Sequence, residues 1–217
     1  MPVIIVWHQV LSSSGVENLM RYLSILTVII FLGGCAAAVE TVDLATPEEL
    51  LQRASAQMEE KRRPLAAEEL ILEAMLMCEA AADDLCAARA YKVYAEFLQS
   101  PRLARWARVV RRDGFQSKGM TYDGRFWHAL EYWEKALAAY TKAGRFDGMR
   151  AAQYNIGLLY EVQLSNKEKA CQAYKKSFAS HVIFRLDYPE IPADVPDGYK
   201  NYEEYIRQTM LEAGCLN

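Results

Sequence analysis

Apolar residues recur every three or four positions along most of the chain after residue 45, which is the spacing of one helix face. The first such stretch places Leu50, Leu51, Ala54 and Met58 on one stripe. The same spacing continues to the C-terminus, so we expect an all-helical domain over residues 46–217. The predicted helices cover about 46–63, 65–81, from Asp83 to before Ser100, 101–113, 125–142, 147–163, 167–184 and 199–213.

Several helix boundaries are marked by residues that cap or break helices. Thr46 has the side chain of an N-cap, and Pro47 suits the first helical position. Ser100 and Pro101 repeat that signal at the start of another helix. Between residues 186 and 198, three prolines forbid a helix, at positions 189, 192 and 196. The helix predicted after them, at about 199–213, is expected to cap the helical array.

Two parts of the chain match each other at a fixed interval. A small residue, an aromatic residue and a second small residue occur at the same spacing in residues 129–137 and 170–178. The interval is 41 residues, from position 129 to position 170. A period of 20–50 residues is typical of stacked helical hairpins, none of which buries its apolar face alone.

These positions resemble the tetratricopeptide repeat. In that motif an aliphatic-Gly pair is followed by Tyr in the first helix, and the second helix has Ala with an aromatic residue four positions on. Small residues would let two helices approach closely, and aromatic residues would fill the space beside them. The matching residues here are Ile156, Gly157, Tyr160, Ala170 and Tyr174, with Ala129 and Trp133 in the preceding second helix.

The match to the repeat is partial. Gln153 stands where the motif has Trp, no Pro ends either second helix, and the turn before Ala170 is one residue longer. A generic helical bundle is the alternative. The resemblance implies a short solenoid of antiparallel helical hairpins, whose first helices line a groove for a protein or peptide. In that groove Tyr154 would be an aromatic anchor, and the other expected residues are Lys92, Glu96, Leu158 and Glu161.

The predicted helix at about 101–113 is unusually basic and interrupts the repeat. One interpretation is a solvated face whose arginines pair with acidic neighbours. The other is a basic amphipathic helix that contacts anionic headgroups or an acidic partner. Its arginines are Arg102, Arg105, Arg108, Arg111 and Arg112.

The start of the chain has the features of a bacterial secretory signal. Arg21 precedes an apolar run at 23–32, which closes on Leu32-Gly33-Gly34-Cys35. That ending resembles a lipobox, which implies cleavage before Cys35 and lipidation of its thiol. Ala36 after the cysteine, rather than Asp, implies sorting to the outer membrane, facing the periplasm.

Three other interpretations of this segment remain open. Residues 22–39 approach the length of a transmembrane anchor. Ala36-Ala37-Ala38 could serve as an Ala-x-Ala cleavage site that releases a secreted soluble protein. The run could also be a buried helix. With the lipobox interpretation, residues 1–19 are a mis-annotated upstream extension, 20–34 the signal peptide and 35–45 a tether.

Four cysteines remain if Cys35 is lipidated, and an even number in an oxidising compartment suggests disulfides. The spacing of Cys78 and Cys86 resembles the Sel-like repeats, relatives of the tetratricopeptide repeat, in which such a pair joins the end of one repeat to the start of the next. Cys171 and Cys215 are then left by elimination as a second pair. Inert buried thiols are the alternative for them.

Composition and motifs give no indication of catalysis. The net charge of −3 offers no electrostatic case for nucleic-acid binding. The three histidines, His8, His128 and His181, stand singly, so we expect surface or packed residues and neither a metal site nor a cofactor. No Gly-rich phosphate loop or nucleophile elbow is present. We interpret Glu68-Glu69 and Glu203-Glu204 as charged helix faces.

The sequence therefore favours a non-enzymatic interaction protein. Its main hypothesis is a lipid-anchored helical-repeat adaptor or scaffold in the bacterial cell envelope, which binds a protein or peptide in the groove. A second hypothesis is a permanent structural subunit of an envelope or secretion assembly. An enzyme acting on cell-wall material would need an acid–base pair that the sequence does not reveal. No small-molecule substrate is evident.

Overall fold

The computed structural model describes residues 45–59, 63–193 and 195–216. In these ranges the regular elements are helices, and no strand is present. The all-helical prediction is therefore confirmed for the described residues. The α-helices are α2 (Pro47–Glu59), α3 (Pro64–Ala80), α4 (Asp84–Gln99), α5 (Ala107–Asp113), α6 (Arg125–Lys142), α7 (Phe146–Leu158), α8 (Lys167–Asp187) and α9 (Tyr202–Glu212), with a 3-10 helix η1 (Pro101–Trp106) and a π-helical segment η2 (Leu159–Gln163).

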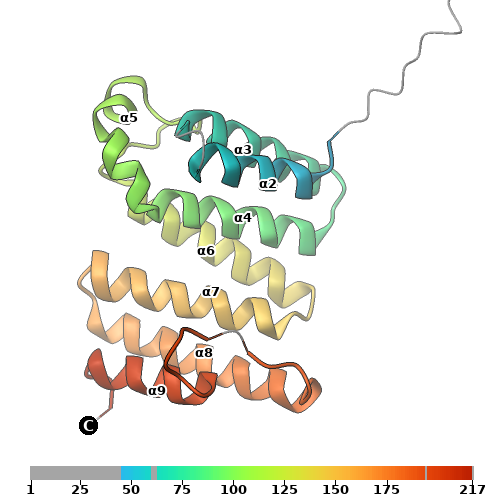
Figure 1. Ribbon diagram of the computed structural model, residues 1–217, viewed down its shortest axis with the longest axis vertical. Helices are drawn as coiled ribbons and strands as arrows, with labels where there is room; N and C mark the ends of the chain where they lie inside the picture. Colours follow the sequence, from blue (N-terminus) through green and yellow to red (C-terminus); the bar gives the residue numbers. More distant parts are fainter. Residues whose placement is uncertain (1–44, 60–62, 194, 217) are drawn as a thin grey trace, which may run out of the picture. The chain divides into compact units, whose positions relative to one another are not determined.

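Helices that follow one another in the chain pack against one another. Helix α2 lies on α3, α3 on α4, α4 on α6, α6 on α7, and α7 on α8, while α9 lies against α8 (Figure 1). Pairs joined by short turns, such as α7 and α8, run in opposite directions. Figure 1 also shows that α5, which comes between α4 and α6 in the chain, lies to one side of this succession.

The capping residues set several of the observed boundaries. The backbone N–H of Glu49 donates to Thr46 Oγ1 at 3.2 Å, and Glu49 Oε2 accepts from the Thr46 N–H at 2.8 Å. This reciprocal capping box satisfies two donors that the helix cannot satisfy itself. Asp83 caps α4 and Asn201 caps α9 in the same general way. Because Asn201 is the cap, the last helix begins at Tyr202, three residues later than predicted.

Several of the residues that resemble the repeat lie in the packed interior. Ala129, Trp133, Ala170 and Tyr174 are all completely buried. A Cβ atom added to Gly157 would lie 2.4 Å from the ring of Tyr174, so only glycine permits this approach of α7 to α8. The turn before Ala170 is preceded by the wider π-helical segment η2, which accommodates the additional residue there.

Two disulfides join neighbouring helices. Cys78 of α3 is bonded to Cys86 of α4, and Cys171 of α8 is bonded to Cys215, just after α9. Both pairs are those expected from the sequence. The first bond fixes the turn between two helices, and the second holds the end of α9 to the start of α8.

The basic segment at 101–113 differs from its prediction. Instead of one α-helix it is the 3-10 helix η1 followed by the short α5. The loop that follows turns back into the core, where Phe115, Met120 and Tyr122 are buried. The segment therefore contributes to the packing of the domain.

A buried carboxylate holds this loop in place. Glu68 on α3 is completely buried, so its interpretation as part of a charged face is wrong. Its Oε2 accepts from the backbone N–H of Gln116 at 2.9 Å, and Oε1 accepts from the Ser117 N–H at 3.4 Å. The Tyr94 hydroxyl also donates to Oε1, at 2.7 Å. Glu68 thus satisfies backbone donors that the loop would otherwise leave buried and unpaired.

Replacing Gly157 with Ala is expected to lower the free energy of unfolding by roughly 1–3 kcal/mol, because the added methyl group overpacks the contact with Tyr174. Chemical denaturation measures the change. Combining it with Tyr174→Leu should cost less than the sum of the two single changes, since the smaller side chain makes room. Strict additivity would contradict the contact.

Replacing Glu68 with Ala is expected to lower the free energy of unfolding by roughly 2–4 kcal/mol, because it leaves a cavity and orphans the buried donors of Gln116 and Ser117. The matched control is Glu69→Ala, which removes an exposed carboxylate from the same turn and should change stability by about 0.5 kcal/mol or less. Equal effects of the two changes would contradict the role assigned to Glu68.

The penalty of Glu68→Ala should also depend on pH. Burial raises the pKa of Glu68 above its usual 4.5, although the hydrogen bonds from Gln116, Tyr94 and Ser117 oppose this. A group whose pKa is raised by folding stabilises fully below its unfolded pKa and loses that contribution as the pH rises through its folded pKa. The stability difference between the native chain and Glu68→Ala should therefore shrink from pH 4 toward neutrality.

Candidate functional site

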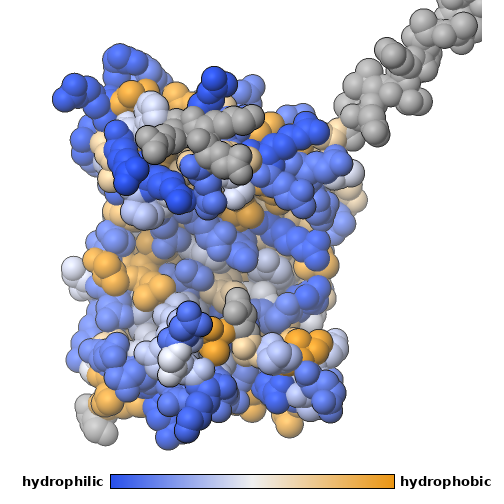
Figure 2. All heavy atoms as spheres, in the orientation of Figure 1, coloured by the Kyte–Doolittle hydropathy of each residue, from blue (hydrophilic) through white to orange (hydrophobic). Residues whose placement is uncertain are grey.

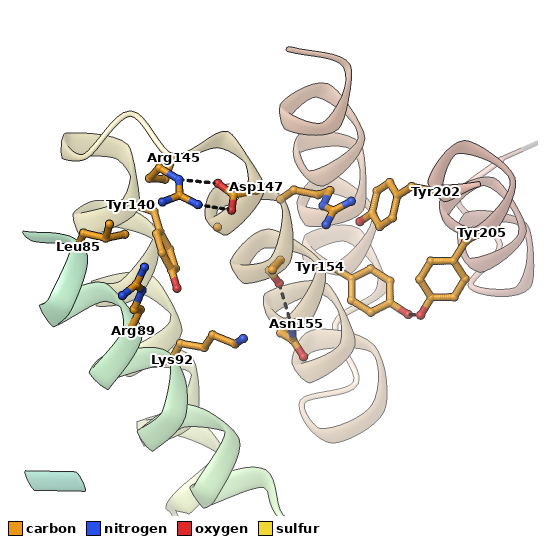
Figure 3. Close-up of a pocket in the computed structure, with 13 residues that line it drawn as sticks. Leu85, Arg89, Lys92, Tyr140, Arg145, Asp147, Tyr154, Asn155, Tyr202 and Tyr205 are labelled. Atoms are coloured by element: carbon orange, nitrogen blue, oxygen red, sulfur yellow. Dashed lines mark hydrogen bonds and ion pairs between the residues drawn. The ribbon is translucent and has the colours of Figure 1, made fainter. Parts of the chain in front are cut away.

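A cavity of about 410 Å³ lies between α4, α7 and α9. Helix α4 contributes Leu85, Arg89 and Lys92, which share one face because they are four and three positions apart. In Figure 3, Lys92 points across the cavity toward Tyr154 and Asn155 on the facing helix. The other lining residues are Tyr140, Arg145, Asp147, Gly148, Arg150, Ala151, Tyr202 and Tyr205.

The charged groups of the cavity are mostly basic. Arg145 and Asp147 form a two-pronged ion pair, at 2.7 and 2.9 Å (Figure 3). Burial alone would raise the pKa of Asp147, but its hydrogen bonds with Arg145 hold it below the usual range. The one carboxylate of the lining is thus ionised and already paired, which leaves Arg89, Lys92 and Arg150.

Arg150 packs on an aromatic ring, and no carboxylate of the residues that the structure describes pairs with it. Its guanidinium lies 4.5 Å from the centre of the Tyr202 ring, and its backbone carbonyl accepts from the buried Ser177 hydroxyl at 2.7 Å. Neither Nε nor Nη1 has a hydrogen-bond partner within the described ranges, although both are buried. Unpaired buried donors of a cation are costly, and the positive charge of Arg150 at the cavity is not neutralised by a carboxylate of the lining.

Tyrosines form the walls of the cavity. The hydroxyls of Tyr154 and Tyr205 are hydrogen-bonded to each other, with the ring centres 5.3 Å apart. Burial raises the pKa of Tyr202 to about 12, against the effect of its bond to Ser177 and of the charge on Arg150. The phenol is therefore neutral at physiological pH and offers Arg150 an aromatic face.

Gly148 lines the cavity and permits a close contact between α6 and α7. A Cβ atom there would lie 2.3 Å from the ring of Tyr140, so the absence of a side chain lets α6 and α7 meet. The sequence analysis did not single out this glycine. The sequence feature that could have indicated it is its position in the first turn of the helix that follows the Ala143-Gly144 turn.

Of the five residues predicted for the groove, the structure brings two into this cavity, Lys92 and Tyr154. Glu96 instead lines a separate cavity beside α2. Its Oε1 lies 3.7 Å from Nζ of Lys92. Leu158 packs partly buried against the cluster around Tyr174. Glu161 lies in η2 and accepts a hydrogen bond from the Tyr174 hydroxyl at 2.5 Å.

The sequence analysis missed Arg89, Arg145 and Arg150 as groove residues. Arg89 and Lys92 share a face of α4, and Arg150 lies one turn before Tyr154 on α7. Helical spacing alone could therefore have added Arg89 and Arg150. The position of α9, which brings Tyr202 and Tyr205 to the cavity, had no such local signal.

The arginines of the basic segment are largely paired. Arg102 lies 3.2 Å from Glu59, Arg111 lies 2.7 Å from Asp123, and Arg112 lies 2.6 Å from Asp113. Arg105 and Arg108 are exposed. These pairs favour the interpretation of the segment as a solvated basic face.

The histidines have different surroundings. His181 is buried, and its Nε2 lies 2.8 Å from Glu203 Oε1 on α9, while His128 lies 3.6 Å from Glu131 on its own helix. Within the residues that the structure describes, no three His, Cys, Asp or Glu side chains are grouped to hold a metal.

In the same ranges no helix is long and apolar enough to cross a membrane. Cys35 lies outside the described residues.

Figure 2 shows that hydrophilic residues dominate the face seen in Figure 1, and that hydrophobic residues appear on it in small separate groups.

Comparisons of the chain with protein-family models, curated proteins and solved structures found no match.

Proposed function

We propose that this protein is a lipid-anchored helical-repeat adaptor of the bacterial cell envelope, and that it binds a protein partner in the cavity between α4, α7 and α9. The observation that carries the proposal is the composition of this cavity. Four basic groups line it against one carboxylate and stand beside tyrosines, and arginine and tyrosine are enriched where proteins bind one another.

The pairing of helices supports a short solenoid of the tetratricopeptide type. Helices α2 and α3, α4 and α6, and α7 and α8 make three hairpins, and each hairpin packs on the next. In such an array the first helices of the hairpins line one surface, and α4 and α7 are first helices. Residues of both helices line the cavity, which fits such an arrangement.

Two features support export to the envelope. Residues 32–35 have the lipobox pattern, and the other four cysteines form two disulfides. Structural disulfides persist in oxidising compartments such as the bacterial periplasm. The lipobox and the disulfides are independent features, and both are consistent with a location in the periplasm.

The second candidate function is that of a permanent subunit of an envelope assembly. Apolar side chains are exposed at the end of α8 and in the segment after it, where a solenoid would receive a further unit. They are Val182, Ile183, Leu186, Tyr188 and Ile191, of which Leu186 is 76% exposed.

Replacing Arg89 and Lys92 together with Ala is expected to abolish co-purification of the partner from envelope extracts of the native host. Both side chains are about half exposed, so the melting temperature should stay nearly unchanged. The matched control replaces Lys135 on α6 and Lys175 on α8 with Ala and should retain the partner. A partner kept by the Arg89/Lys92 variant but lost on Leu186→Arg would instead favour the permanent subunit.

Replacing Cys35 with Ala is expected to abolish incorporation of a metabolic fatty-acid label and to shift the protein from the membrane fraction to the soluble fraction or to an uncleaved precursor. The label requires the thiol of that cysteine. Cys78→Ala serves as the control, since it removes a different cysteine and should keep the label. Unchanged labelling of the Cys35→Ala chain would rule out the lipoprotein assignment.

A further inference from the structure

The cavity between α4, α7 and α9 carries a charge opposite to that of the chain as a whole. The chain has a formal net charge of −3, yet the lining contains Arg89, Lys92, Arg145 and Arg150 against the single carboxylate of Asp147. Since Asp147 is committed to Arg145, the remaining positive charge is not neutralised from within the lining.

The pairs that Arg89 and Lys92 make outside the cavity are weak. Arg89 lies 3.0 Å from Glu48, and Lys92 lies 3.7 Å from Glu96, with all four side chains about 40–50% exposed. Exposed pairs of this kind contribute about 0–1 kcal/mol. An incoming carboxylate can therefore compete for both cations at little cost.

Arg150 is the most prepared of the four cations. The face of Tyr202 packs against its guanidinium, and Ser177 bonds the Tyr202 hydroxyl, at 2.6 Å, while donating to the backbone carbonyl of Arg150. Two of its nitrogens, Nε and Nη1, are buried and have no hydrogen-bond partner among the described residues. Positioning before binding lowers the entropic cost of fixing a long side chain, so a carboxylate should gain most at this residue.

We propose that the groove binds an acidic segment of a partner protein, with carboxylates at Arg150 and across the cavity at Lys92 and Arg89. The inference rests on the proposed function, because it assigns the chemistry of the partner to the same surface. Cations on two facing helices suit an extended segment with several carboxylates. The walls of Tyr154 and Tyr205 give such a segment apolar contact that a single small anion would not use.

The test uses the full chain in non-ionic detergent and fluorescence anisotropy of a labelled ten-residue peptide of alternating Glu and Gly. A peptide of alternating Gln and Gly is the neutral counterpart. We expect the Glu peptide to bind at least about tenfold more tightly than the Gln peptide. Its affinity should fall as the salt concentration is raised. Equal binding of the two peptides would overturn the proposal.

Arg150→Met keeps an unbranched apolar stem and removes the guanidinium with its charge, and it is expected to weaken binding of the Glu peptide by about tenfold. Arg150→Lys should recover part of the loss. The matched control is Arg108→Met, which removes an exposed arginine of α5 and should leave the affinity within about twofold. Unchanged affinity of the Arg150→Met chain would overturn the role of Arg150. If that variant melts early, the half-exposed Lys92→Met serves instead, with the same expectation.

Acetate and inorganic phosphate separate a segment from a small anion. Each is added at a concentration equal to that of the peptide's carboxylates. If either acetate or phosphate displaces the Glu peptide, the site binds free anions, and the assignment to a protein segment is wrong. If the Glu peptide does not bind, yet the Arg89/Lys92 variant still loses its partner in the co-purification, the proposed function stands and only this inference falls.

Discussion

The fold depends on one kind of contact, in which a residue without a bulky side chain on one helix receives an aromatic ring from the next. At Gly157 the ring of Tyr174 occupies the space of a missing Cβ atom, and at Gly148 the ring of Tyr140 does the same. Each contact brings two helices close enough to exclude water along their length. Isolated helices of this length are marginal in water, so this packing, more than intrinsic propensity, stabilises them.

The basic segment and its loop show how the same domain tolerates an interruption. A loop that enters the core brings backbone N–H groups which water can no longer reach. Glu68 accepts from two of them and from Tyr94, while Phe115 and Met120 contribute buried apolar surface. The carboxylate is costly to bury, and it is retained because the loop donors and the Tyr94 hydroxyl converge on it.

Much of this arrangement could be predicted from the sequence because its causes are local. Helical spacing gave the bounds of α6, and Asp83 and Ser100 marked the starts that the structure has. The burial of Glu68 could not be foreseen, because its partners Gln116 and Ser117 are 48 and 49 positions away. The same holds for the candidate site. Lys92 and Tyr154 follow from helix faces, whereas the contribution of Tyr202 depends on where α9 returns, beyond three prolines.

The site and the packing are connected through shared residues. Tyr174, which fills the space at Gly157, also lies with its ring centre 5.7 Å from that of Tyr154 in the cavity wall. Ser177, one turn further along α8, bonds both the carbonyl of Arg150 and the hydroxyl of Tyr202. Helix α8, the second helix of the α7–α8 hairpin, thus holds the wall of the groove in place. Because those contacts are made within the chain itself, the binding proposed for this groove would need no rearrangement of α7 against α8, and less of its free energy would be spent on ordering the wall of the site.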